Sequence, residues 1–210
     1  MITGTDREMV MRVLNVGAGG QDFGDIRVDA VRTPSIHAVA DAEHLPFRDS
    51  SFSMVYSNCV FEHLRNPGAA LDEMFRVLRV DGTLDLTTDH AAYWAFHLLM
   101  DHATHYTKGR DRHYSLYSPS HVRAHCEAAG FHVLKLELEY NLHGKWRFAD
   151  RIIRSIPFLA IFTAWRIHVR AVKSPQGGRV EPAVTGGRAL KFSHRLRELY
   201  EGRGTEKEPQ

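Results

Sequence analysis

Short apolar runs that end in glycine or an acidic residue make up the first half of the chain. Residues 12–16 end in Leu-Asn-Val and run straight into three glycines within four positions, Gly17, Gly19 and Gly20. This pattern predicts a buried strand that ends in a tight loop. Glycine suits such a loop because it reaches left-handed backbone conformations and lets the main chain approach a ligand. An ordinary glycine turn has the same pattern, so the loop alone does not identify a site.

The same reading along the chain predicts strands and helices in alternation. Further strands are predicted at residues 26–29, 36–40, 53–59, 83–88, 131–140 and 166–173. One helix should begin after Asn66, because apolar residues recur there at helical spacing, at Leu71, Met74, Phe75 and Leu78. Another should begin with Ser118 as N-cap and Pro119 in the first position. Gly82 is expected to end the first helical region with its permissive backbone. Alternation of this kind is typical of an α/β domain.

Two segments depart from this alternation. Residues 89–117 concentrate histidines, tyrosines and charged residues, which favours an acceptor site; a solvated helix and loop remains an alternative. A metal site would use Asp101, His102 and His105, but a matched second pair of ligands is missing. Residues 152–165 are the most apolar, yet are too short and too interrupted to span a bilayer. They fit a packed helical pair, a dimer surface or an amphipathic patch on anionic lipid.

Composition places the chain among soluble globular proteins of one domain with appendages. It has 210 residues, of which 43% are hydrophobic, and a formal net charge of +2. Charge is uneven: residues 1–139 hold 13 Lys and Arg against 19 Asp and Glu, whereas residues 140–210 hold 14 against 6. The basic end therefore favours contact with something anionic. The two cysteines show no disulfide framework, and the first eleven residues lack a secretory signal, so we expect a cytoplasmic protein.

Five motifs in order carry a family resemblance. They are Val-Gly-Ala-Gly at 16–19, Asp29, Asp-Ala-Glu-His-Leu-Pro-Phe at 41–47, Phe-Glu-His-Leu at 61–64 and Arg-Val-Leu at 76–78 with Gly82. Together they resemble class I S-adenosylmethionine-dependent methyltransferases, in the small-molecule group called type 11. Asp29 follows Gly17 by only 12 positions, so the usual first helix cannot fit. We predict one turn or an irregular loop at residues 21–25.

The resemblance implies a fold and a set of cofactor-binding residues. The fold would be a three-layer Rossmann-like methyltransferase sandwich, with a mostly parallel seven-stranded sheet, an antiparallel last strand and the strand order 3-2-1-4-5-7-6. The cofactor would be S-adenosyl-L-methionine, with Asp29 on the ribose, Asp41 and Ala42 on the adenine, and the fourth strand's end beside the methionyl part. The cofactor-binding residues are then Gly17, Ala18, Gly19, Asp29, Asp41, Ala42, Ser57 and Asn58. No resident metal is expected.

The domain layout follows from the same reading. Residues 1–173 would form the methyltransferase domain, with a substrate-side insertion at 89–117 and an apolar, basic helical insertion at 145–166. Residues 174–210 would be a linker, a short helix and a polar tail.

Methyl transfer to a hydroxyl needs a general base near the sulfonium. Candidates in the 89–117 segment are Asp89, His90, His105 and His113. Glu62 and His63 are a further pair, but sequence neighbours do not face each other on a helix, so a structural role is favoured.

The acceptor would be a small molecule, such as a sugar, a glycan or a lipid-linked compound. We expect no nucleic acid partner, with peripheral membrane contact and a homodimer left open. Two other functions remain: a module that binds the cofactor or a nucleotide without chemistry, and a nicotinamide oxidoreductase, which the short loop disfavours.

Overall fold

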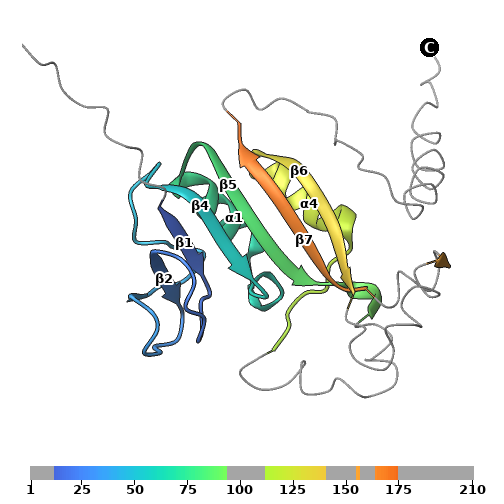
Figure 1. Cartoon of the computed structure of the whole chain (residues 1–210), viewed down its shortest axis with the longest axis horizontal. Coiled ribbons are helices and arrows are strands. Elements are labelled where there is room, and N and C mark those ends of the chain that lie inside the picture. The colour runs from blue at the N-terminus through green and yellow to red at the C-terminus, as the bar shows by residue number, and fades with distance from the viewer. Residues whose placement is uncertain (1–11, 94–111, 141–154, 157–163, 175–210) are drawn as a thin grey trace, which may run out of the picture.

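The computed structural model describes residues 12–93, 112–140, 155–156 and 164–174, and the structural statements below concern these residues (Figure 1). They form one sheet of seven strands with α-helices packed against it. The strands are β1 (Val13–Val16), β2 (Ile26–Asp29), β3 (Ala38–Val39), β4 (Phe52–Asn58), β5 (Leu78–Asp89), β6 (Phe131–Tyr140) and β7 (Ala164–Lys173). The helices are the 3-10 turn η1 (Phe61–His63), α1 (Pro67–Val77) and α4 (Pro119–Ala128).

The strand order is β3-β2-β1-β4-β5-β7-β6, as the resemblance implied. β1 to β5 pair in parallel, while β7 runs antiparallel to both β5 and β6. The mostly parallel, Rossmann-like methyltransferase sheet is therefore confirmed. Because the parallel strands β1 to β4 point the same way, their carboxyl ends meet at one edge of the sheet, where open α/β sheets bind ligands.

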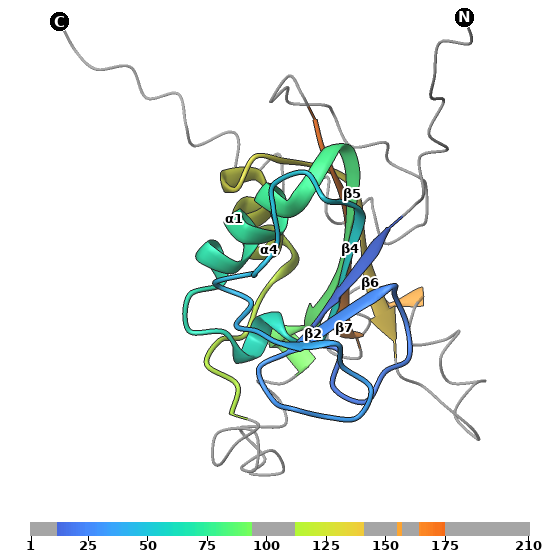
Figure 2. The same ribbon diagram turned by 90° about the vertical axis from the view of Figure 1, so that its left-hand side faces the viewer.

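Both described α-helices cover the same face of the sheet (Figure 2). The core lies between them and the strands, where Leu14, Val55, Leu71, Leu84 and Val169 have no exposed surface. The predicted caps are confirmed. Asn66 Oδ1 accepts the Ala69 N–H at 3.2 Å, and Ser118 Oγ accepts the His121 N–H at 3.4 Å. No helix in the described ranges is long and apolar enough to cross a bilayer.

The role expected of Gly82 is wrong. Helix α1 ends at Val77, and β5 begins at Leu78 and continues through residue 82. The left-handed backbone belongs to Asp81, with φ of 62°. Gly82 is required for space instead, because a Cβ there would lie 2.8 Å from the Arg79 carbonyl oxygen. Likewise Ala164–Arg166, expected inside a helical insertion, form the start of β7.

Residues 94–111 of the substrate-side insertion lie outside the described residues, and so do the helical insertion before Ala164 and the C-terminal extension, apart from Ser155, Ile156 and Ser174. The membrane and dimer readings of residues 152–165 therefore stay predictions.

A charged cluster occupies the sheet face that turns away from α1 and α4. Leu84 and Leu86 of β5 point into the core, so Asp85 between them points the other way. His168 Nε2 donates to Asp85 Oδ1 at 2.7 Å, and the Arg170 guanidinium lies 3.0 Å from Oδ2. Burial acts to raise the Asp85 pKa, but the hydrogen bonds from His168 and Arg170 outweigh it and lower the pKa. The hydrogen bond to Asp85 raises the His168 pKa.

We expect His168→Gln to lower the free energy of unfolding more at pH 5.5 than at pH 9. A raised pKa contributes stability that is fully present below the unfolded value of about 6.5 and is lost as pH rises through the folded value. Urea denaturation at the two pH values measures the difference. His121→Gln, at an exposed position on α4, is the control. An equal effect of His168→Gln at both pH values would contradict the charged pairing.

Candidate cofactor and acceptor site

The loop after β1 has the strained backbone that its glycines predict. Gly17 and Gly19 adopt φ of +74° and +53°, a region closed to most residues with a side chain. The N–H groups of Gly17 and Ala18 both donate to the Val28 carbonyl, at 2.8 and 3.0 Å. A Cβ on Gly17 would overlap the side chain of Val60, which follows β4. The loop is thus held between the ends of β2 and β4.

No helix follows this loop, as the short spacing predicted. Residues 21–23 are irregular and residues 24 and 25 form a bend, and the chain returns to the sheet where Asp25 N–H donates to the Val13 carbonyl at 3.0 Å. The Phe23 ring packs edge-on against Tyr56 of β4, with centroids 4.8 Å apart. An aromatic contact therefore takes the place of a helix on this part of the sheet.

Asp29 ties the glycine loop to the end of β2. Its Oδ2 accepts the Gly19 N–H and its Oδ1 accepts the Val31 N–H, both at 2.8 Å. A carboxylate has about four lone-pair sites, so each oxygen keeps capacity for another donor. Asp29 can therefore order the loop and accept a ligand hydroxyl at the same time.

A pocket of about 490 Å³ opens at the carboxyl ends of β1 to β4. This size lies in the usual range for small-molecule sites of about 300–1,000 Å³. Among the predicted cofactor residues, its lining includes Gly17, Asp29, Asp41 and Ala42. Ala18 and Asn58 adjoin lining residues in the chain, and Gly19 and Ser57 lie one position farther away; none of the four is part of the wall. The sequence thus identified residues that converge on the pocket from three separate segments.

Two further features fit a ligand with both donors and acceptors. Asp41 is exposed at the end of the β3 segment, and its Oδ1 accepts the Glu43 N–H at 2.9 Å. Ser57 is 1% exposed at the end of β4, and its hydroxyl has no hydrogen-bond partner among the described residues. A buried polar group without a partner is costly, so a ligand or water that reaches it would be stabilised.

The structure brings two of the four catalytic candidates together. His113 Nδ1 lies 3.5 Å from Asp89 Oδ2, and both side chains are less than a tenth exposed. The Arg166 Nε lies 4.0 Å from the other Asp89 oxygen. His90 instead donates from Nδ1 to the Ala164 carbonyl at 2.8 Å, and burial lowers its pKa. His105 lies outside the described residues, as do Asp101 and His102 of the metal alternative.

Glu62 and His63 have different surroundings although they adjoin in sequence. Glu62 is 1% exposed and accepts the Thr88 hydroxyl at 2.7 Å, and burial raises its pKa, so its role is structural as expected. His63 lines the pocket. Its Nδ1 donates to the Arg112 carbonyl at 3.1 Å, which leaves Nε2 as an acceptor in the neutral ring. Its ring lies edge-on to that of His113, with centroids 4.6 Å apart.

Sequence reasoning missed three other lining residues, Arg65, Arg112 and Tyr114. Arg112 and Tyr114 stood within the polar segment 89–117, but no spacing distinguished them from their neighbours. The signal that was available is alternation: an extended segment turns residues 112 and 114 to one side and residue 113 to the other.

Acidic and sulfur side chains also gather at this wall, which Cys59 itself lines. Cys59, Glu62 and Asp89 place one ligand atom each within 4.8 Å of one another. Burial raises the pKa of the Cys59 thiol to about 12, so it is protonated and a poor metal ligand near neutral pH. Arg166 already supplies a positive charge to Asp89. We therefore interpret Cys59, Glu62 and Asp89 as residues that contact other protein groups rather than a metal ion.

Comparison with known proteins agrees with this geometry. Residues 20–85 match the family model of the methyltransferase domain. The chain has the class I methyltransferase fold, and residues 20–85 are similar to the methyltransferase domain family. The malonyl-[acyl-carrier protein] O-methyltransferase of Geobacter sulfurreducens is 34% identical over 111 residues, 50% of this chain and 42% of that protein. The enzyme of the same name from Laribacter hongkongensis is 42% identical over 65 residues, 31% of this chain and 22% of that protein.

A solved structure supports the fold. The S-adenosylmethionine-dependent methyltransferase of Mesorhizobium loti superimposes with a TM-score of 0.52 at 15% identity, over 77% of this chain and 90% of that one. The chain spans less than half the length of the two curated relatives that it matches. The family and the fold imply S-adenosyl-L-methionine as the cofactor of the domain.

For this methyltransferase domain we expect Asp29→Ala to weaken S-adenosylhomocysteine binding by about 1–3 kcal/mol, the range for a hydrogen bond to a charged group. The variant removes a ligand acceptor and also frees the Gly19 N–H. Titration calorimetry measures the affinity. Asp72→Ala, at an exposed position on α1, is the matched control. Unchanged affinity in a folded Asp29 variant would overturn the ribose assignment.

Proposed function

We propose that this chain transfers the methyl group of S-adenosylmethionine to a hydroxyl oxygen of a small-molecule acceptor. The observation that carries the proposal is the pocket at the carboxyl ends of β1 to β4, whose wall combines Gly17, Asp29 and Asp41 with His63. One side of that wall has acceptors for a ribose and an amine, and the other has the imidazole of His63, whose Nδ1 contacts the Arg112 carbonyl.

The residues present fit the cofactor. Gly17, Ala18 and Gly19 would give the close backbone approach, and Asp29 would accept the ribose hydroxyls. Asp41 and Ala42 would meet the adenine, while Ser57 and Asn58 would lie beside the methionyl part. When bound, S-adenosylmethionine supplies a methyl group on sulfonium, which is already a good leaving group. The protein mainly contributes proximity and removal of the acceptor proton.

We assign the removal of the acceptor proton to His63 Nε2. The hydrogen bond from Nδ1 to the Arg112 carbonyl fixes the tautomer in which Nε2 can accept. His113 lies edge-on to His63 and beside Asp89, and both are positioning residues, because a nearby carboxylate stabilises positive charge as His63 becomes protonated. The acceptor hydroxyl would lose its proton to His63 Nε2 as its oxygen takes up the methyl group that bound S-adenosylmethionine would supply. His90 takes no part in this assignment, and His105 remains a candidate outside the described residues.

The acceptor class proposed from sequence is a sugar, a glycan or a lipid-linked compound. The curated relatives are named for methylation of malonyl-[acyl-carrier protein], which favours a second candidate, a carboxylate acceptor. A carboxylate is already a nucleophile and needs no base, whereas His63 has the environment of one. The hydroxyl acceptor therefore remains the first candidate. The domain layout, with residues 1–173 as one methyltransferase domain, belongs to the same proposal.

Release of S-adenosylhomocysteine from S-adenosylmethionine, measured with a panel of acceptors, tests the proposal. The panel contains sugars, sugar phosphates, hydroxy acids and malonyl thioesters. We expect turnover with a hydroxyl compound. Turnover with malonyl thioesters alone would favour the second candidate. Cofactor binding without turnover on any acceptor would favour a non-catalytic binding module.

A further inference from the structure

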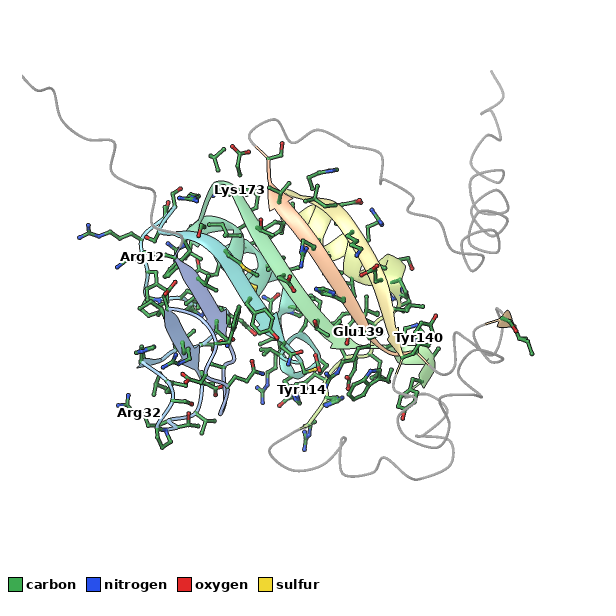
Figure 3. All side chains as sticks on the ribbon, in the orientation of Figure 1. Arg12, Arg32, Tyr114, Glu139, Tyr140 and Lys173 are labelled. Carbon is green, nitrogen blue, oxygen red and sulfur yellow. The ribbon has the colours of Figure 1, made fainter. Side chains whose placement is uncertain are left out.

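Two arginines and a tyrosine form a cationic rim on the pocket wall beside His63. Arg65 follows η1, and Arg112 and Tyr114 come from the segment that returns toward α4. Figure 3 places Tyr114 close to where β4 and β5 end. The Arg65 guanidinium lies 5.4 Å from the centre of the Tyr114 ring and donates to its hydroxyl at 3.4 Å. The Arg112 guanidinium lies 6.0 Å from the same ring.

Neither guanidinium of this rim is neutralised by an ion pair in the described part of the chain. The carboxylates that form ion pairs there bind Arg27, Arg76, Arg123, Lys135, Arg166 and Arg170, as well as two histidines. The hydrogen bond to Tyr114 is the main cause of the raised Arg65 pKa, and the charge of Glu43 is the smallest contribution to it. A guanidinium presents a planar set of donors that suits carboxylate and phosphate oxygens. The rim therefore has unused binding capacity for an oxyanion.

The backbone holds one side of this rim in place. The Tyr114 N–H and Ser115 N–H both donate to the Glu62 carbonyl, at 2.8 and 3.3 Å. The Arg112 carbonyl accepts the His63 ring N–H at 3.1 Å. Hydrogen bonds thus hold the segment 112–115 against η1, and one of them joins His63, the proposed base, to the Arg112 backbone. A ligand that reaches the rim meets a partly preorganised site, which lowers the entropy lost on binding.

We propose that Arg65 and Arg112 bind an oxyanion of the acceptor, a phosphate or a carboxylate, while its hydroxyl lies at His63. The proposal rests on the function proposed above and narrows its substrate class to hydroxy compounds that carry a phosphate or a carboxylate group. The hydrogen bond between His63 and the Arg112 carbonyl couples the two parts of the site. Binding of the anion therefore sets the position of the hydroxyl relative to the base.

Titration calorimetry of the full chain with inorganic phosphate or malonate, with and without saturating S-adenosylhomocysteine, tests this site. We expect both variants, Arg65→Gln/Arg112→Gln and Arg65→Lys/Arg112→Lys, to keep their affinity for S-adenosylhomocysteine. The glutamine pair should bind the preferred anion at least about tenfold more weakly than the natural chain. The lysine pair should fall between the two, because it keeps the charge and loses the planar donors. Arg12→Gln is the control for net charge, since Figure 3 places Arg12 far from Tyr114.

The outcomes separate this proposal from the function on which it rests. Phosphate preferred over malonate would identify a phosphorylated acceptor, and the reverse preference a carboxylated one. Equal anion binding by the glutamine pair and the natural chain would overturn the rim site. Weaker binding of S-adenosylhomocysteine by the glutamine pair would assign the arginines to the cofactor carboxylate and also overturn it. Failure of the natural chain to bind S-adenosylhomocysteine would overturn the proposed function. The anion titrations in the absence of S-adenosylhomocysteine would then still show whether Arg65 and Arg112 bind an oxyanion.

Discussion

Gly17→Val is expected to abolish binding of S-adenosylhomocysteine while the sheet still folds. Residue 17 has a φ of +74°, which a β-branched residue avoids, and its Cβ would overlap Val60. The loop must therefore move, and the main chain that approaches the cofactor moves with it. Titration calorimetry should detect no binding, with circular dichroism and urea denaturation as tests of folding.

Gly20→Val is the matched control for this change. Nothing lies within 4 Å of a Cβ at Gly20, and its φ is not in the left-handed region. It should bind S-adenosylhomocysteine nearly as well as the natural chain. If Gly17→Val also bound normally, the loop would be an ordinary turn and the cofactor assignment would be lost.

His63→Ala and His113→Ala are expected to lower kcat by about 10²- to 10⁴-fold with a hydroxyl acceptor, the usual contribution of a general base. The larger loss should belong to His63, which lines the pocket, and the smaller to His113, which lies between His63 and Asp89. Affinity for S-adenosylhomocysteine should stay within about twofold, because neither residue belongs to the predicted cofactor set. Steady-state kinetics and calorimetry measure the two quantities.

The pH profile separates a base from a structural residue. The natural chain should lose activity as pH falls through the titration of the base, and the residual activity of His63→Ala should not follow that profile. His121→Ala on α4 is the control. Joint loss of stability and cofactor affinity in both variants would mean that the two histidines hold the fold rather than take part in proton transfer.

Much of the fold could be predicted because local patterns and a family resemblance agreed. The bounds of β2 and β6 were predicted correctly, since Asp25 and Asp29 limit β2 and Gly130 precedes β6. The absence of a helix after β1 could be predicted from the length of one segment, because residues 17 to 29 are too few for a helix between two parallel strands. The strand order needed the resemblance, since no local pattern specifies which strands become neighbours.

The remaining features depend on contacts that spacing does not encode. Asp81 rather than Gly82 has the left-handed backbone, and Gly82 is needed because Arg79 and Leu78 leave no space for a Cβ there. The different roles of Glu62 and His63 depend on the direction in which η1 turns, which the sequence does not specify. Glu62 faces the core, whereas His63 faces the pocket. The rim arginines come from segments 47 positions apart that meet only because Tyr114 is fastened to the Glu62 carbonyl.

Calorimetric titration of the full chain with S-adenosylhomocysteine, compared with NAD, tests the central claim most directly. The pocket at the ends of β1 to β4 should bind one molecule of S-adenosylhomocysteine, with affinity that falls in Asp29→Ala and is retained in Asp72→Ala, and it should not bind NAD. Absence of S-adenosylhomocysteine binding by a folded chain, or equal binding of NAD, would contradict the assignment of this pocket to methyl transfer.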